Sequence, residues 1–120
     1  MVQQLDWSKL IPLTYKEIQK ITASSGVYRL SYTPDNGDNY YVFYVGKADN
    51  LKDRLLQHIG NLEDNTCIKD YIRKYSCSFK IAEISDAKIM ANIERQLFSK
   101  FTPRCNFKEP EGEIIEINFD

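Results

Sequence analysis

Two apolar runs joined by a short polar segment constrain this chain of 120 residues more than any other feature. The runs are SGVYRLSY and YYVFYVGK, at residues 25–32 and 40–47, and TPDNGDN joins them. Aromatic and β-branched residues are typical of strands, whereas Pro, Asp, Asn and Gly are typical of turns. The pattern therefore predicts an antiparallel hairpin with a seven-residue connection.

The register of this hairpin follows if Tyr32 faces Tyr40 across the turn. The expected pairs are then Tyr32–Tyr40, Leu30–Val42, Tyr28–Tyr44 and Gly26–Gly46. Because strand side chains alternate, Tyr28 and Tyr44 share one face, about 5 Å apart at Cβ. The other face carries Val27, Phe43 and Val45. A β-bulge would shift this register, and strand tyrosines that only pack are the ordinary alternative to a functional role.

The composition predicts one soluble domain, residues 1–120, with a single hydrophobic core, because 42% of the residues are hydrophobic and 28% charged. No apolar run approaches the roughly 20 residues that span a bilayer. The N-terminus lacks the basic and apolar regions of a secretory signal. Cys67, Cys77 and Cys105 form no C-x-x-C pair, so we expect neither a disulfide framework nor a zinc site, and a reducing, cytoplasmic location.

The charge is unevenly distributed along the chain, although the net charge is only −1. Residues 47–80 carry seven Lys or Arg against five Asp or Glu, whereas residues 105–120 carry one against five. A broad basic field for nucleic acid is therefore absent from the pattern, and phosphate binding would need a local cluster. Residues 108–120 are expected to form an acidic tail or an edge strand.

The remaining periodicity predicts an α/β chain of the α+β type, a three-stranded antiparallel sheet flanked by helices. The third strand is expected in CSFKIAEIS, residues 77–85. Helices are expected at residues 14–23, 51–62, 66–75 and about 86–100. Residues 1–13 are interpreted as an irregular or short-helical lead-in.

Two residues of the expected helix 51–62 form a candidate cationic group. Arg54 and His58 are four residues apart and therefore share a face, and Lys47 lies at the end of the preceding strand. An exposed arginine and a half-buried structural histidine explain the spacing equally well.

A carboxylate lies on the apolar face of the last expected helix. Glu94 is four residues after Met90 and four before Phe98. Because an uncompensated buried charge is costly, Glu94 needs a cation. A Lys or Arg would serve, and so would Mg²⁺, which prefers oxygen ligands and retains most of its waters.

These features together resemble the GIY-YIG nuclease family. GVY at 26–28 and YVG at 44–46 stand for its two tripeptides. Arg54, His58, Glu94 and Asn106 after Pro103 follow in the family's order. YVGKADNLKDRLLQH is similar to the excision-repair incision subunits and their small relatives. The motif-bearing core covers about 24–107.

The chain departs from that pattern in three ways. The connection between the tripeptides is longer than usual, Val replaces Ile in both, and the overall charge is acidic. No separate DNA-binding domain follows, so we expect targeting to come from this domain, a partner protein or a homodimer.

The resemblance implies metal-dependent hydrolysis of phosphodiester bonds. Glu94 would hold one Mg²⁺ or Mn²⁺, and Arg54 would stabilise the negatively charged transition state. Tyr28 would position or deprotonate the attacking water, with its pKa lowered by Lys47 and the metal. Tyr44 and His58 would hydrogen-bond phosphate or water, and His58 would shuttle a proton.

Three further residues complete the candidate set. Gly46 would let the backbone turn closely beneath the site. Lys47 would bind phosphate, and Asn106 would bind substrate or support the site from behind.

The resemblance leaves three functions open. The first is an endonuclease acting on DNA. The second is a non-catalytic nucleic-acid-binding or interaction module that retains the fold, and the third is a small RNA-processing nuclease.

Overall fold

A computed structural model of the chain describes residues 2–35 and 37–119, so Asn36 of the predicted turn and Asp120 of the tail lie outside the described residues. The centre is an antiparallel sheet of four strands in the order β2-β5-β3-β4. These strands are β2 (Ile11–Pro12), β3 (Gly26–Thr33), β4 (Tyr41–Ala48) and β5 (Ser76–Glu83). The three predicted strands are confirmed, and β2 adds a fourth from the segment expected to be irregular or helical.

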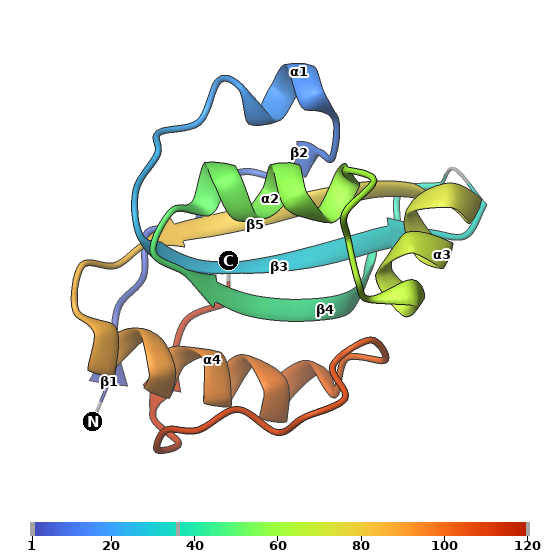
Figure 1. Ribbon diagram of the computed structural model, residues 1–120. Coiled ribbons are helices and arrows are strands. Elements are labelled where there is room, and N and C mark those ends of the chain that lie inside the picture. The colour runs from blue at the N-terminus through green and yellow to red at the C-terminus, as the bar shows by residue number, and fades with distance from the viewer. Residues whose placement is uncertain (1, 36, 120) are drawn as a thin grey trace.

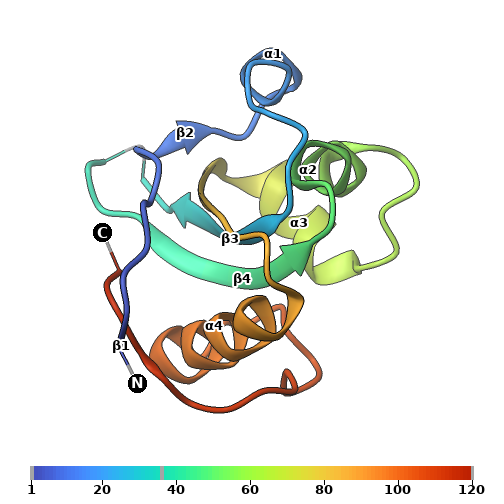
Figure 2. The ribbon, with the colours of Figure 1, turned by 90° about the vertical axis from the view of Figure 1, so that its left-hand side faces the viewer.

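Helices cover both faces of this sheet, as predicted (Figures 1 and 2). The helices are α1 (Tyr15–Ile18), α2 (Leu51–Ile59), α3 (Thr66–Lys74) and α4 (Ala87–Phe101). The first three lie on one face and α4 lies on the other. Side-chain caps fix their starts: Asn50 accepts from the Asp53 N–H, and Asp86 accepts from two N–H groups of α4.

Two expectations at the chain ends need correction. The predicted helix 14–23 is only α1, four residues long behind its Thr14 cap. In the predicted acidic tail or edge strand, the described residues contribute only β6 (Glu116–Ile117), which pairs in parallel with β1 (Val2–Gln3) away from the main sheet. Within residues 2–35 and 37–119, no helix is long and apolar enough to cross a membrane.

The hairpin forms as predicted, but its register was wrong by one residue at Tyr32, which pairs with Tyr41, and by two residues at Leu30 and Tyr28. Tyr28 pairs with Gly46, and Leu30 pairs with Tyr44. One residue of this difference arises at the turn, and the other at an irregularity between Leu30 and Ser31, where Phe43 is the extra residue on β4. An even shift preserves alternation, so Tyr28 and Tyr44 still share a face.

The bulge also changes the side on which Phe43 packs. Phe43 was expected beside Val27 and Val45, but it is buried with the opposite cluster and stacks on Tyr71 of α3, with ring centroids 4.7 Å apart. Val27 and Val45 pack toward α4 as expected. The expected single core is therefore two apolar layers, one on each face of the sheet.

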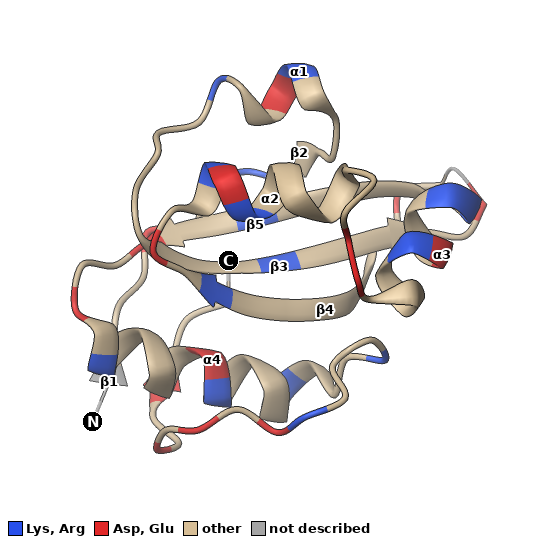
Figure 3. Ribbon diagram, in the orientation of Figure 1, with Lys and Arg blue, Asp and Glu red and all other residues tan. Residues whose placement is uncertain are grey.

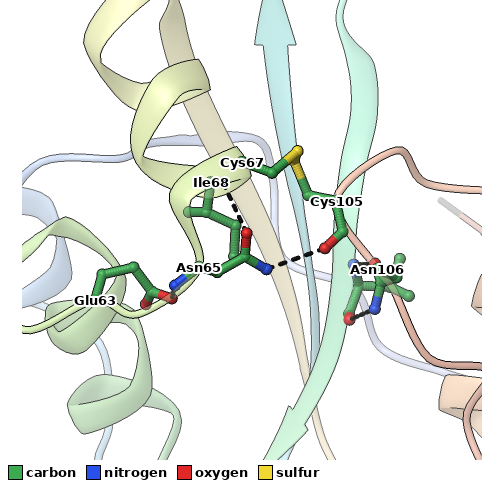
Figure 4. Close-up of a disulfide and its surroundings, with 7 residues drawn as sticks. Glu63, Asn65, Cys67, Ile68, Cys105 and Asn106 are labelled. Carbon is green, nitrogen blue, oxygen red and sulfur yellow. Dashed lines mark hydrogen bonds between the residues drawn. A yellow bond between two sulfur atoms is a disulfide. The ribbon is translucent and has the colours of Figure 1, made fainter.

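A disulfide joins Cys67 to Cys105, contrary to the expectation from cysteine spacing (Figure 4). Asn65, the cap of α3, donates through Nδ2 to the Cys105 carbonyl at 3.0 Å. This contact holds the start of α3 beside the segment after α4, and the two Cα atoms are 5.4 Å apart. The cysteines are 38 positions apart, so no local spacing could reveal the pair.

Candidate active site

The two tyrosines of the hairpin meet above Gly46. Their ring centroids are 6.1 Å apart. A Cβ atom built on Gly46 would lie 2.5 Å from the Tyr28 hydroxyl oxygen, far inside contact distance. Gly46 is therefore required because the phenol end of Tyr28 occupies the space of its missing side chain.

Behind the tyrosines lies a buried chain of polar groups. The Tyr28 hydroxyl is 2.7 Å from Nε2 of His58, and Nδ1 of His58 is 2.8 Å from Oε2 of Glu63. All three side chains are buried. His58 is there because α2 begins at its Asn50 cap and turns Leu51, Leu55 and His58 toward the sheet.

Burial decides the protonation of the two aromatic partners. It raises the pKa of Tyr28 well above that of an ordinary phenol, and the charge and hydrogen bond of Arg54 act in the opposite direction. The opposing cation is thus Arg54, not Lys47 as expected. Burial lowers the pKa of His58, against the attraction of Glu63. Both groups are accordingly neutral at pH 7, and the imidazole can accept a proton.

Tyr44, rather than Tyr28, opens to solvent. Tyr28 is fully buried, whereas Tyr44 is partly exposed and lines a cavity of about 360 Å³ with Lys47, Glu94 and Asn106. Burial and, after it, the charge of Glu94 raise the pKa of Tyr44, while Arg54 and the hydrogen bond between Tyr44 and Tyr28 lower it. Tyr44 therefore lies between the cavity and the buried polar groups of Tyr28, His58 and Glu63.

Glu94 enters this cavity from α4 with cations beside it. Burial raises the pKa of its carboxyl, and Lys47, Arg54 and a backbone hydrogen bond from Lys47 lower it. Arg54 is exposed and lines an adjoining cavity with Lys47. Among the residues that the structure describes, no group of three or more His, Cys, Asp or Glu side chains is placed to hold a metal ion. A cation at Glu94 would therefore complete its shell with water, which suits Mg²⁺.

The open edge of β4 holds the site together. The Cys105 N–H donates to the Phe43 carbonyl at 2.9 Å. Asn106 uses both ends of its amide on Val45, accepting from the N–H and donating to the carbonyl at 2.9 Å each. Asn106 thus supports the strand that carries Tyr44, and its amide is engaged there rather than with substrate.

The structure brings the predicted catalytic set together. Tyr28, Tyr44 and His58 are in ring contact, while the charges of Arg54 and Glu94 act on both tyrosines. Sequence reasoning missed Glu63, which lies in the loop after α2. The available signal was indirect, because a buried lone histidine needs a partner and Glu63 follows it by five residues.

Comparison with known proteins agrees with this geometry. The family model of the GIY-YIG catalytic domain matches residues 24–108. The chain belongs to the GIY-YIG family. UvrABC system protein C of Rickettsia bellii (strain RML369-C) is 31% identical over 106 residues, 88% of this chain and 15% of that protein. The same protein of Rickettsia rickettsii (strain Sheila Smith) is 34% identical over 82 residues, 68% of this chain and 12% of that protein.

This GIY-YIG chain also shares its fold with solved structures. The GIY-YIG N-terminal endonuclease domain of UvrC from Thermotoga maritima, bound to its catalytic divalent cation magnesium, matches with a TM-score of 0.58. The match has 19% sequence identity and covers 76% of this chain and 92% of that domain. A point mutant of the same domain matches with a TM-score of 0.59 and 18% identity, over 78% and 93% of the two chains.

Proposed function

We propose that this GIY-YIG chain is a metal-dependent endonuclease that hydrolyses phosphodiester bonds in DNA. The observation that carries the proposal is the position of Tyr44. It shares a cavity with Lys47 and Glu94, and its phenol meets the buried Tyr28, which is bonded to His58. A carboxylate, a cation and a route for a proton therefore meet at one opening.

Glu94 would hold one Mg²⁺ or Mn²⁺. Its carboxylate is partly buried, and burial disfavours its ionised form, so a divalent ion would supply the missing compensation. When bound, such an ion neutralises charge on the phosphate and the leaving oxygen. Lys47 and Arg54 flank the position and add positive charge where the pentavalent transition state is most negative.

The tyrosines move the proton of the attacking water. Tyr44 is the group that water in the cavity can reach, so it takes the role first expected of Tyr28. A hydroxyl has one proton to donate, and that of Tyr28 points to Nε2 of His58, so Tyr44 donates to Tyr28. A proton can then pass from water to Tyr44, to Tyr28 and to His58.

The substrate class, partners and location belong to the proposal as well. DNA is preferred because the similar domain is part of the UvrABC system protein C, although the chain spans only 15% of that protein. A partner protein or a homodimer would supply targeting. A cytoplasmic location now rests on the DNA substrate alone, since the Cys67–Cys105 disulfide removes the argument from cysteine usage.

A cleavage screen tests the proposal. Nicked, branched, single-stranded and duplex DNA and matching RNAs would be incubated with the protein and Mg²⁺ or Mn²⁺. We expect DNA cleavage that requires the metal and is lost in Glu94→Ala but retained in Glu113→Ala, which removes an exposed carboxylate outside the cavity. Cleavage by Glu94→Ala at the wild-type rate would refute the metal assignment.

A binding module is the second candidate, because acidic residues surround the same opening. Glu109 and Glu111 line the cavity with Glu94, and Figure 3 shows acidic residues along the segment that follows α4. These charges oppose the approach of a scissile phosphate to this opening, which disfavours cleavage there but not binding at another surface of the domain. Binding of DNA or RNA without cleavage across all metals and substrate shapes would favour this function over the nuclease. Cleavage of RNA alone would favour the RNA-processing nuclease.

A further inference from the structure

Glu63 is a buried carboxylate that lies outside the predicted catalytic set. It is 7% exposed, in the loop between α2 and α3. Its Oε2 is 2.8 Å from Nδ1 of His58, and its Oε1 accepts the Asn65 N–H at 2.9 Å. Figure 4 shows Glu63 beside Asn65 at the start of α3. Both oxygens are therefore fixed, one by the backbone and one by the imidazole.

We infer that Glu63 is a positioning residue that holds His58 in the tautomer with its proton on Nδ1, so that Nε2 faces Tyr28 as a proton acceptor. A carboxylate can only accept a hydrogen bond, so the proton of this contact must be on Nδ1. The lone pair of Nε2 then lies 2.7 Å from the Tyr28 hydroxyl oxygen. The inference rests on the proposed nuclease function for its catalytic meaning, but the tautomer can be tested without it.

Without Glu63, the proton on Nδ1 would lose its hydrogen-bond acceptor, and this tautomer would no longer be favoured. The opposite tautomer would place a proton on Nε2 and leave Tyr28 facing a donor. A proton arriving from Tyr28 would then have no acceptor. With Glu63, the imidazolium that forms is held by a charged hydrogen bond, which is about twice as strong as a neutral one.

Hydrolysis of the phosphodiester bond begins at the attacking water. An O–H bond of the attacking water breaks, its proton goes to Tyr44, and the protons of Tyr44 and Tyr28 each move one place inward, ending on Nε2 of His58. The electron pair of the hydroxide forms the new P–O bond. The P–O bond to the leaving alkoxide breaks with its electron pair, and the alkoxide takes a proton from solvent. The imidazolium finally gives its Nε2 proton back through Tyr28 and Tyr44 to water in the cavity, which restores the resting tautomer with its proton on Nδ1.

His58 also borders solvent on the side of α3. The imidazole lines a surface cavity of about 210 Å³ with Gly60, Asn61, Lys69 and Arg73. The cavity lies between the end of α2 and α3.

The charges around His58 have opposing effects. Tyr28 of β3 and Tyr44 of β4 face it and are neutral, Glu63 faces Nδ1, and Lys69 and Arg73 of α3 line its cavity. In a separate contribution, the charge of Arg54 on α2 lowers the pKa of His58 together with burial. Glu63 is thus the one anion that acts on the imidazole among the groups named, so its removal should lower the pKa.

The chain contains a single histidine, which allows a direct test. The ¹⁵N chemical shifts of the His58 ring would be recorded between pH 4 and 9 in protein without metal. We expect a protonated, pyrrole-type Nδ1 and a pyridine-type Nε2 in the neutral form. A neutral imidazole with its proton on Nε2 would overturn the inference, whether or not the protein cleaves DNA.

Three variants separate charge from structure. Glu63→Gln keeps the acceptor for Asn65 but removes the charge, so the pKa of His58 should fall and the Nδ1–H signal should lose intensity. Glu63→Asp should restore the pKa toward wild type. Asp64→Asn makes the same charge change on the exposed neighbouring residue and should leave the His58 titration unchanged. An unaltered His58 tautomer and pKa in folded Glu63→Gln would overturn the inference.

Kinetics provide the second readout. Relative to the cleaving wild type, Glu63→Gln should lower kcat about 10- to 100-fold with KM unchanged, by analogy with the loss of a partner that orients a metal-ligating histidine. The acidic limb of its pH–rate profile should move to lower pH with the His58 pKa. Equal kcat values and profiles would refute the catalytic role. If the wild type cleaves no nucleic acid, the nuclease proposal fails, while the ring nitrogens still decide what Glu63 does to His58.

Discussion

Both faces of the central sheet bury polar side chains, but those side chains have different partners. On the α4 face, Asn92 accepts the Glu113 N–H and Arg29 donates to the Phe119 carbonyl, so both bind the backbone of the C-terminal segment. On the α2 face, Tyr28, His58 and Glu63 bind one another, and Glu63 accepts the Asn65 N–H as well. The first arrangement fixes a segment of chain in place, whereas the second links groups that can exchange protons. The partner of a buried polar group, rather than its burial, therefore distinguishes support from chemistry.

Reduction of the Cys67–Cys105 disulfide, on the α2 face, should lower the free energy of unfolding more than any other change proposed here. The disulfide closes a loop between residues 38 positions apart, which in the chain-entropy description corresponds to about 4 kcal/mol of unfolding free energy. We therefore expect a reductant to lower the free energy of unfolding by that amount in urea titrations. Cys77→Ser is the control, since burial raises the pKa of the Cys77 thiol to about 12 and keeps it unreactive. A reductant-independent midpoint would show that the covalent link is not what stabilises this face.

Gly46→Ala should disturb the same face by about 1–3 kcal/mol, the usual cost of overpacking. The added Cβ would displace the Tyr28 ring and lengthen its hydrogen bond to His58. We expect a lower free energy of unfolding together with changed ¹⁵N shifts of His58. Gly60→Ala is the matched control, because its nearest neighbour would be 3.2 Å away, at the Leu56 carbonyl. Unchanged His58 shifts in Gly46→Ala would break the link between the glycine and the polar chain.

Asn92→Ala tests the α4 face and should have a smaller effect, of about 1 kcal/mol, because one hydrogen bond to the backbone is lost. The ¹⁵N signals of His58 should remain as in wild type. Asn61→Ala, an exposed amide, is the comparison variant and should change stability by less than about 0.5 kcal/mol. A shift of the His58 signals in Asn92→Ala would show that the two faces are coupled.

The smallest expected effect is a pH dependence at Glu94, between the two faces. Burial raises the pKa of this carboxyl above its ordinary value. The folded state then binds the proton more tightly than the unfolded state, so the stability due to this group is present at low pH and lost as pH rises through the folded pKa.

Glu94→Gln cannot ionise and avoids that loss. In EDTA, its unfolding free energy relative to wild type should increase from pH 4 to pH 7, as measured by thermal unfolding. Added Mg²⁺ should stabilise the wild type alone. A difference between the two proteins that is constant with pH would contradict the assignment. Glu113→Gln supplies the control for surface charge.

The sequence predicted the elements that have strong periodicity. The hairpin, the helix with Arg54 and His58, and the helix with Glu94 all formed, because alternation and capping residues specify them locally. The strand β2 escaped detection because two residues show no period. The register failed because a bulge depends on how Phe43 packs against Tyr71, which the sequence alone does not state.

In the candidate site, too, the features specified by local sequence were predicted and those that depend on tertiary packing were not. Its members on strands and helices were placed by the order of the motif, whereas Glu63 lies in a loop. The exchange of roles that we propose between Tyr28 and Tyr44 rests on their burial, which follows from the assembled layers and not from the spacing of the tripeptides. The Cys67–Cys105 pair likewise depends on two distant segments meeting.

The bonds along the outer edge of β4 have a consequence for how copies of the chain behave toward one another. An edge strand with free N–H and C=O groups invites a second strand to add, and that addition starts aggregation. On β4 the Phe43 carbonyl is already bound by Cys105, and both backbone groups of Val45 are bound by Asn106. The opposite edge of the sheet is β2, which has two residues and ends in Pro12. Because neither edge offers a regular ladder, concentrated solutions of the folded protein should resist strand-mediated association.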